Sequence, residues 1–553
     1  MNQGQTARRL ERVEPHKGLV MRLCSVVLSL LVVAGPASAA ERLDLVAVTK
    51  IRDEGFRRSQ VMEVAHALTD TIGPRLTGSP NAKRANELTR RKLADWGLSN
   101  VHLEAWGPFG RGWSYEFATV RMLEPDVSQM VAIPKAWTPG TEGTKRARVV
   151  RIQKLEGETD FQAHRGKLAG KIVFLGETPT LKPHDQPLLK RHDAKSLEQL
   201  ANYVGVDHSS RVDEWKKQEK LRESVNQFLH DEKAVAVVVP GKGGDGGTFD
   251  VQEGGSFKLG DPLGIPLLVM ATEHFGRIDR LIAHDTVVEL AIDVRARFHQ
   301  DDPMGYNTIA ELPGTDKKHE LVMLGAHLDS WHGGTGATDN AAGVAAVMEA
   351  MRILKASGVR PRRTIRVALW TGEEQGLLGS SAYIEKHFAK RPVPKEPEER
   401  DLPSWAREKT GPLTFRPGYR RLSAYFNLDN GTGRIRGIYA QGNAAARPIF
   451  ERWLEPLRDL GVTTVTMRSV SNTDHVSFDA VGLPGFQFIQ DEVEYVTRSH
   501  HSNMDVYERL QSEDLIQAAI VIATFAYHAA ISDEMFPRKP LPKPAPTKPH
   551  KPL

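Results

Sequence analysis

The sequence predicts an α/β protein in which helices cover both faces of a sheet, with a second, mostly β region inserted into the chain. Past Tyr306, short apolar runs alternate with longer helical segments, which is the pattern of an α/β sheet. Between about residues 125 and 300, short β-branched runs are separated by Gly, Pro and charged linkers, which is typical of a separate β region. A chain of 553 residues is also too long for one core and should form two or three domains.

The first 39 residues have the pattern of a secretory signal peptide. A basic start at Met21 and Arg22 precedes an apolar centre that ends in Ala37-Ser38-Ala39, so we expect cleavage after Ala39. Translation starts at Met21 in one interpretation, because residues 1–20 would be an unusually long basic extension. The apolar run is short for a membrane span, which disfavours the alternative of a membrane anchor. We therefore expect a secreted or periplasmic, bacterial protein with no stable membrane insertion after cleavage.

Composition excludes several classes of protein. The only cysteine, Cys24, lies inside the predicted signal peptide, so the mature chain would have no disulfide, cysteine ligand or cysteine nucleophile. The 74 basic and 69 acidic residues give a net charge of +5, which is too weak for its length to indicate a nucleic-acid partner. Much of the excess lies in the two ends of the chain, and we predict a disordered, Pro- and Lys-rich tail at residues 534–553.

The first part of the predicted α/β domain covers residues 40–124. Apolar residues at helical spacing predict helices at Asp44–His66 and Asn81–Trp96, and alternation predicts strands at Val101–Ala105 and Glu116–Met122. Residues 125–300 form the inserted β region, whose predicted strands are Ala147–Ile152, Lys171–Leu175, Ala234–Val239, Ile265–Met270 and Val287–Val294. Within it, Lys182–His230 is charged and helical in places and is predicted to be a surface insertion.

The second part of the α/β domain covers residues 301–533. Its predicted strands are Leu321–Gly325, Thr364–Trp370, Leu422–Leu428 and Phe486–Ile489. Its predicted helices are Asn340–Lys355, Gly376–Phe388 and Ala444–Leu460. Pro, Lys and Glu interrupt this alternation at Ala389–Arg420, which predicts a long loop.

Chemically active side chains follow the ends of these strands. His327 and Asp329 follow the first strand, and a Gly-rich turn leads to Asp339, a good N-cap for the next helix. Each further candidate also has an ordinary structural explanation: the acidic pair after Trp370 suits a helix start, and Asp429 begins a common turn. Open α/β sheets bind ligands at the carboxyl ends of their strands, so we expect the following residues to converge there: His327, Asp339, Glu373, Glu374, Asp429 and His501.

Nitrogen and oxygen ligands without sulfur suit zinc, and a carboxylate that bridges would allow two ions. The order H-x-D, D-N, E-E, D, H-S-x-x-D resembles the co-catalytic zinc exopeptidases of the aminopeptidase Y and glutamate carboxypeptidase type. Within that group, three stretches resemble carboxypeptidase Q and its bacterial relatives: Gly73–Ser79, Trp106–Trp113 and His327-Leu-Asp-Ser-Trp. The resemblance covers about Leu43 to Ser532 and implies a mixed, largely parallel sheet of the zinc-exopeptidase fold, with an inserted protease-associated-like β domain.

The resemblance also implies roles for individual residues. One zinc would be held by His327, Asp339 and Glu374, and the other by Asp339, Asp429 and His501, with Asp339 bridging. Glu373 would be the general base, and Asp329 would orient His327 through its other ring nitrogen. The family often has a cis peptide after the bridging Asp, here Asp339–Asn340. His475 would either face the oxyanion or pack in a loop, and His332 is at most a pocket-lining residue.

We therefore expect two Zn²⁺ per chain and a metallo-exopeptidase that acts at the end of a peptide or on a dipeptide. One alternative is a non-catalytic peptide- or protein-binding module on the same fold. Another is a single-zinc acyltransferase of the glutaminyl cyclase kind. The choice between aminopeptidase and carboxypeptidase stays open at this point, as does the role of Ala389–Arg420, either a lid or the contact of a homodimer.

Overall fold

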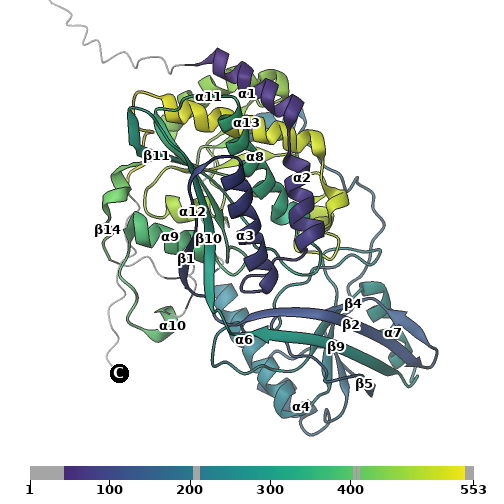
Figure 1. Cartoon of the computed structure of the whole chain (residues 1–553). Helices are drawn as coiled ribbons and strands as arrows, with labels where there is room; N and C mark the ends of the chain where they lie inside the picture. The colour runs from purple at the N-terminus through teal and green to yellow at the C-terminus, as the bar shows by residue number, and fades with distance from the viewer. Residues whose placement is uncertain are drawn as a thin grey trace, which may run out of the picture. The chain divides into compact units, whose positions relative to one another are not determined.

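A computed structural model of the chain describes residues 43–203, 212–400, 402, 407, 411–471 and 473–541. The predicted signal peptide, Cys24 and the last part of the predicted tail lie outside these residues. The described residues contain two eight-stranded sheets with helices packed on them (Figure 1). The predicted α/β class is therefore confirmed, with a mixed sheet and covering helices.

The first sheet is parallel at its centre and antiparallel toward its edges. Strands β12, β11, β15 and β18 run parallel to one another, whereas β10 pairs antiparallel with β12 and β1, and β16 pairs antiparallel with β18. The edge strand β17 is parallel to β16. In sheet order the strands are β1 (Ser99–Pro108), β10 (Met304–Leu312), β12 (Arg363–Trp370), β11 (Lys317–His327), β15 (Leu422–Asn427), β18 (Gly485–Gln490), β16 (Ile435–Tyr439) and β17 (Thr464–Thr466).

Helices cover both faces of this sheet because its central strands are apolar on both sides. Val322 and Leu324 of β11 point into the larger core, and Met323 between them points into the core on the opposite face. The larger core includes residues of α1 (Leu45–Arg58), α2 (Val61–His66), α3 (Pro80–Asp95), α8 (Ala342–Ala356), α11 (Arg447–Leu454) and α13 (Ser512–Ile531). The opposite core includes residues of α9 (Leu378–His387) and α12 (His475–Asp479).

Among the described residues, α13 is the one helix long and apolar enough to cross a membrane by length and composition. Its most apolar stretch is 94% buried within the protein, where it packs against α8 and α1. We therefore attribute its apolarity to its place in the core.

The second sheet is formed almost entirely by the predicted β region. Its order is β3 (Ser128–Met130), β2 (Gly112–Glu124), β9 (Glu289–His299), β5 (Lys145–Ile152), β6 (Ile172–Leu175), β7 (Ala236–Pro240), β8 (Leu267–Met270) and β4 (Ala132–Pro134). Strand β2 pairs with β9 here, whereas the sequence pattern predicts Glu116–Met122 as a strand of the α/β domain. The helices of this segment are α4 (Glu158–His164), α5 (Ala194–Ala201), α6 (Val212–Asp231) and α7 (Thr272–Ala283).

Two predicted irregular segments contain more structure than expected. The predicted loop Ala389–Arg420 includes a two-stranded sheet of β13 (Ala389–Lys390) and β14 (Thr414–Phe415), the short helix α10 (Pro397–Arg400) and a 3₁₀ turn at Pro417–Arg420. The predicted tail begins too early, because Phe536 is buried and its ring stacks on Phe450 with centroids 5.2 Å apart. An aromatic side chain in the sheet's own core fixes the chain at least that far.

Candidate metal centre

The site forms where three neighbouring parallel strands end. Strand β11 ends at His327, β12 ends just before the segment that carries Glu373 and Glu374, and β15 ends two residues before Asp429. Because parallel strands present their carboxyl ends at the same edge, these side chains meet. His501 reaches this edge from a loop that follows a π-helical turn at Tyr495–Ser499.

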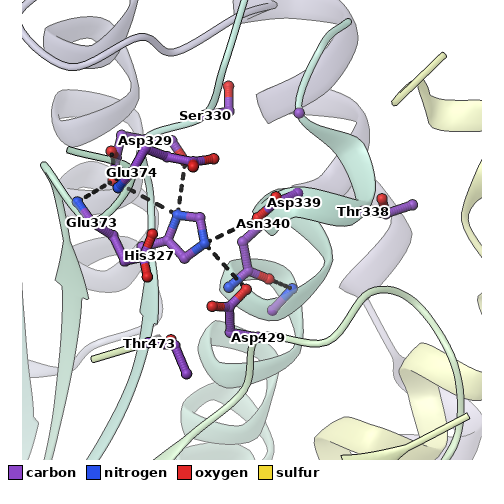
Figure 2. Close-up of polar contacts among 12 residues, drawn as sticks. His327, Asp329, Ser330, Thr338, Asp339, Asn340, Glu373, Glu374, Asp429 and Thr473 are labelled. Carbon is purple, nitrogen blue, oxygen red and sulfur yellow. Dashed lines mark hydrogen bonds and ion pairs between the residues drawn. The ribbon is translucent and has the colours of Figure 1, made fainter. Parts of the chain in front are cut away.

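The structure brings together all five predicted ligand residues. Nε2 of His327 lies 3.1 Å from Oδ1 of Asp339 and 3.2 Å from Oδ1 of Asp429 (Figure 2). Nε2 of His501 lies 3.3 Å from Oδ2 of Asp339 and 3.0 Å from Oε2 of Glu374. The two oxygens of Asp339 thus face two different histidines, as a bridging carboxylate would.

The arrangement divides the residues differently from our expectation. Asp429 faces His327 and Glu374 faces His501, whereas the resemblance had implied the opposite pairing. His327, Asp339 and Asp429 place ligand atoms within 4.8 Å of one another. Asp339 forms a second such group with His501 and its neighbour His500, whose Nε2 is 3.8 Å from Asp339 Oδ2.

The carboxylate of Asp339 does not cap helix α8, which corrects a second expectation. Asp339 has non-helical dihedral angles (φ −129°, ψ 88°), and its side chain points to the histidines. The capping contact comes from Asn340, whose Oδ1 accepts a hydrogen bond from the main-chain N–H of Gly343 at 2.9 Å. The peptide Asp339–Asn340 is cis, as the family resemblance implied.

Asp329 contacts both His327 and the backbone of the acidic pair Glu373 and Glu374. Its main-chain oxygen is 3.0 Å from Nδ1 of His327, and its carboxylate is 3.7 Å from the same nitrogen. The carboxylate instead accepts hydrogen bonds from the main-chain N–H groups of Glu373 and Glu374, each at 3.3 Å. The prediction that Asp329 orients His327 therefore corresponds mainly to a main-chain contact, while its carboxylate fixes the acidic pair.

Two residues of the Gly73–Ser79 loop support this arrangement and were missed as site residues. The hydroxyl of Thr77 donates to Oδ2 of Asp329 at 2.8 Å. The fully buried guanidinium of Arg75 donates to the main-chain oxygens of Leu328, Thr335 and Gly336 at 2.7 to 2.8 Å. Arg75 thus holds both ends of the turn between His327 and Asp339. The sequence predicts a turn-rich loop here, but nothing local in it predicts these long-range contacts.

Asp505 was also missed, although it is the last residue of the H-S-x-x-D pattern. Its carboxylate accepts hydrogen bonds from the main-chain N–H of Thr338 at 2.6 Å, the hydroxyl of Thr338 at 2.8 Å and the main-chain N–H of Asp339 at 3.1 Å. Burial, together with the nearby carboxylate of Asp339, raises the pKa of Asp505 to about 7. Asp505 therefore connects the His501 loop to the backbone that carries the central carboxylate.

The acidic pair is buried in a strongly charged environment. Burial raises the pKa of Glu373 well above its ordinary value, an effect that His327 opposes and that the carboxylates of Asp429 and Asp474 increase. Burial likewise raises the pKa of Glu374 to about 7, although His501 lowers it. Glu374 Oε1 is buried and has no hydrogen-bond partner among the described residues. An unpaired carboxylate oxygen of this kind is costly unless a cation or a proton is present.

Two further histidines lie apart from this cluster. His475 is fully buried, with Nε2 3.1 Å from the main-chain oxygen of Val470, and burial lowers its pKa to about 4. His332 is also buried, and its Nε2 lies 2.8 Å from the main-chain oxygen of Pro134. Among the described residues, neither ring is hydrogen-bonded to the five clustered side chains. A role for His475 at an oxyanion stays a prediction.

The donor set fits a metal centre. Carboxylate oxygens and imidazole nitrogens converge, three carboxylates face two histidines, and Glu374 Oε1 has no hydrogen-bond partner within the described part of the chain. Such oxygen- and nitrogen-rich groups bind divalent cations of the zinc type. The five residues could together hold two ions that share Asp339.

The chain is similar to known peptidases in sequence. Residues 307–526 match the family model described as Peptidase family M28. Carboxypeptidase Q of Mus musculus is 27% identical over 496 residues, which cover 89% of this chain and 90% of that protein.

Solved structures give the same result. A peptidase M28 precursor from Shewanella amazonensis SB2B is 25% identical, with a TM-score of 0.61 over 90% of this chain and 98% of that one. The zinc aminopeptidase BSAP of Bacillus subtilis is 18% identical and has the same fold, with a TM-score of 0.53 over 86% of this chain and 98% of that one. From the converging strand-end residues and these matches, we conclude that residues 307–526 form a domain similar to peptidase family M28 and that the protein is a zinc-dependent peptidase.

Proposed function

We propose that this protein is an exported two-zinc exopeptidase, which releases single residues from the end of a peptide or splits dipeptides. One observation carries the proposal: Asp339 directs its two oxygens to His327 and His501, and one further carboxylate stands beside each histidine. Asp429 completes the first group and Glu374 the second. Each group offers three protein ligands, which is the number typical of a catalytic zinc ion that keeps a position open.

Zinc would bind to His327, Asp339 and Asp429 in one group and to Asp339, Glu374 and His501 in the other. When bound, a pair of such ions supplies Lewis-acid chemistry that makes water a better nucleophile and the amide carbonyl a better electrophile. The protein's own contribution is to fix these ligands. Asp329, Thr77 and Asp505 do so through hydrogen bonds to the side chains and backbone of the site.

Glu373 is the residue proposed to move protons. It is buried beside the ligand Glu374, and the charges of His327 and Asp429 act on its carboxylate, but it belongs to neither group of ligands. Its carboxylate would take a proton from the attacking water and return it to the nitrogen of the leaving amine. The hydrogen bond from its main-chain N–H to Asp329 fixes its backbone for this task. A positioned general base of this kind contributes about a hundredfold to ten-thousandfold in rate.

The relatives support an exopeptidase but differ in the end that they act on. One is a carboxypeptidase by name and another a zinc aminopeptidase. Export rests on the signal-peptide pattern of residues 1–39. We further propose that the second sheet belongs to an inserted, protease-associated-like domain of about residues 125–300, preceded by strand β2.

The proposal is tested with the full mature chain. We expect two zinc ions per chain, and hydrolysis of unblocked dipeptides and short peptides that stops when a chelator removes the metal. Comparing peptides blocked at the N-terminus with peptides blocked at the C-terminus identifies the end that is cleaved. Zinc binding without hydrolysis would instead support a binding module. One zinc per chain with cyclisation of an N-terminal Gln would support the acyltransferase.

A further inference from the structure

A segment far outside the matched M28 residues lies against the loop that carries His501. The main-chain N–H of Val251 donates to the carbonyl oxygen of His501 at 2.9 Å. The main-chain N–H of Phe249 donates to Oδ1 of Asn503 at 2.9 Å, and that of Asn503 donates to the carbonyl oxygen of Phe249 at 3.1 Å. The chain around residues 249–252, which follows β7 of the second sheet, is thus hydrogen-bonded along the ligand loop.

This pairing brings the side chain of Gln252 to the imidazole of His501. The amide of Gln252 lies 2.9 Å from Nδ1 of His501, while Nε2 of the same ring faces Asp339 and Glu374. Two further rings contact this imidazole: His500 stacks on one face with centroids 3.8 Å apart, and Trp331 packs against it in a T-shaped arrangement at 6.2 Å. Gln252 therefore contacts Nδ1, the nitrogen of His501 that points away from Asp339 and Glu374.

The proton on the imidazole decides which end of the amide is needed. A neutral imidazole that gives its Nε2 lone pair to a cation carries its proton on Nδ1, so Nδ1 is a donor and needs an acceptor. An amide nitrogen cannot accept, but an amide oxygen can. Rotating the end of Gln252 by about 180° exchanges its nearly equivalent nitrogen and oxygen, which places Oε1 at Nδ1 with the contact preserved.

We propose that Gln252 is a positioning residue of the metal centre, which accepts a hydrogen bond from Nδ1–H of His501 through Oε1. This inference rests on the proposed zinc function. The contact selects the tautomer with a free lone pair on Nε2 and holds that nitrogen toward Asp339 and Glu374. Residues from the inserted region thereby complete the site.

The two histidines are then held in different ways. Nδ1 of His327 faces the main-chain oxygen of Asp329, two residues away within the same domain. Nδ1 of His501 faces a side chain that is 249 positions distant in the chain. The His501 side of the centre thus depends on the second sheet being in place, whereas the His327 side does not.

The test is the zinc affinity of the full mature chain, measured by competition with a chromogenic chelator. Gln252→Leu removes the acceptor and should weaken the His501-side zinc by about 10- to 100-fold. Gln252→Glu keeps an acceptor, now charged, and should bind zinc at least as tightly as the wild type. Gln252→Lys offers only donors and should bind at least as weakly as the Leu variant.

The matched control is Asn226→Leu. Asn226 lies in α6 of the inserted region, and its amide donates to the main-chain oxygen of Gly254 at 2.7 Å, without contact to His501. This variant should keep the wild-type zinc affinity. The melting temperature of the metal-free protein should be similar in Gln252→Leu and Asn226→Leu, which separates an effect on the site from loss of fold.

Two results would overturn the role of Gln252: unchanged zinc affinity in the Leu variant, or a Glu variant that binds as weakly as the Leu variant. The second result would show that the position is needed for its amide shape and not as an acceptor. If the wild type binds no zinc at all, the proposed function fails and the inference fails with it. If the wild type binds two zinc ions and the Gln252 variants bind zinc with the same affinity, only the role of Gln252 is rejected and the proposed function stands.

Discussion

Oε2 of Glu374 lies 3.0 Å from Nε2 of His501. Asp429 makes the equivalent approach to His327, at 3.2 Å. Each histidine thus has its own carboxylate, and Asp339 lies between the two groups. This division makes the two halves of the centre separable by substitution.

We predict that Glu374→Ala and Asp429→Ala each reduce the zinc content from two ions per chain to about one, because each removes a ligand of a different group. Asp339→Ala should lose both ions, since both groups share this carboxylate. Metal analysis after dialysis against low zinc measures the content. Glu385→Ala, an exposed acidic position on α9, is the control and should keep both ions. A Glu374→Ala, Asp429→Ala double variant with full zinc content would contradict the assignment.

Glu373→Gln should reduce the rate of peptide hydrolysis by about a hundredfold to ten-thousandfold, because an amide cannot take the proton of the attacking water. Zinc content should stay at the wild-type level, since Glu373 lies outside both ligand groups. The measurement is kcat on a dipeptide, with zinc analysis of the same sample. Loss of zinc in this variant would assign Glu373 to the ligands and reject its role as a base.

Thr77→Val should weaken zinc binding by about 10- to 100-fold, because Oδ2 of Asp329 loses the hydroxyl that holds it. Asp329 in turn holds the backbone of Glu373 and Glu374, so the effect reaches the ligands. Thr77→Ser keeps the hydroxyl and should bind zinc nearly as the wild type does. Chelator competition measures both variants. Equal affinities for the Val and Ser variants would show that the hydrogen bond has no influence on the metal.

Arg75→Lys should destabilise the protein by about 3 kcal/mol or more, because a single ammonium nitrogen cannot replace the three separate guanidinium nitrogens that donate to the carbonyl groups of Leu328, Thr335 and Gly336. Urea unfolding of the metal-free protein gives the free energy of unfolding. Arg84→Lys is a matched change at an exposed position of α3 and should alter stability by less than about 0.5 kcal/mol. A similar small change in both variants would show that Arg75 does not hold the turn.

His528 should make stability depend on pH in the acid range. Burial lowers its pKa from 6.5 to about 4 in the folded protein, and its Nε2 lies 3.4 Å from the main-chain N–H of Asp44. The unfolded chain therefore binds this proton more readily, so the stabilisation is fully present above about pH 6.5 and is lost as pH falls toward 4. The loss has an upper limit of about 3 kcal/mol.

His528→Gln removes the titrating group and keeps an acceptor for Asp44. The difference in unfolding free energy between wild type and this variant, measured without metal by urea at pH 7, 6, 5 and 4, should move in favour of the variant at low pH. Taking the difference cancels the buried carboxylates of the site, which titrate in both proteins. Two parallel curves would show that His528 does not carry this dependence.

The sequence by itself determined the class of fold and the residues that meet. Apolar strands followed by His, Asp or Glu predicted the strand-end site, because parallel strands end at one edge and the local pattern encodes where each strand ends. His327, Glu373, Glu374 and Asp429 follow strand ends and were found in this way, whereas Asp339 and His501 lie in a turn and a loop. The same reasoning placed Glu116–Met122 in the wrong sheet, because an alternating run shows that a strand forms and not which strand it pairs with.

Only the tertiary structure decided how these residues are grouped and what holds them. It pairs Asp429 with His327 and Glu374 with His501, and it shows that the carboxylate of Asp339 does not cap helix α8. It also brings Arg75 and Gln252 to the site from segments more than two hundred positions away from their partners. The physical reason is that a hydrogen bond forms only when two groups lie within a few ångströms, which depends on which distant segments pack together. The periodicity and spacing of residues within one segment do not predict that packing.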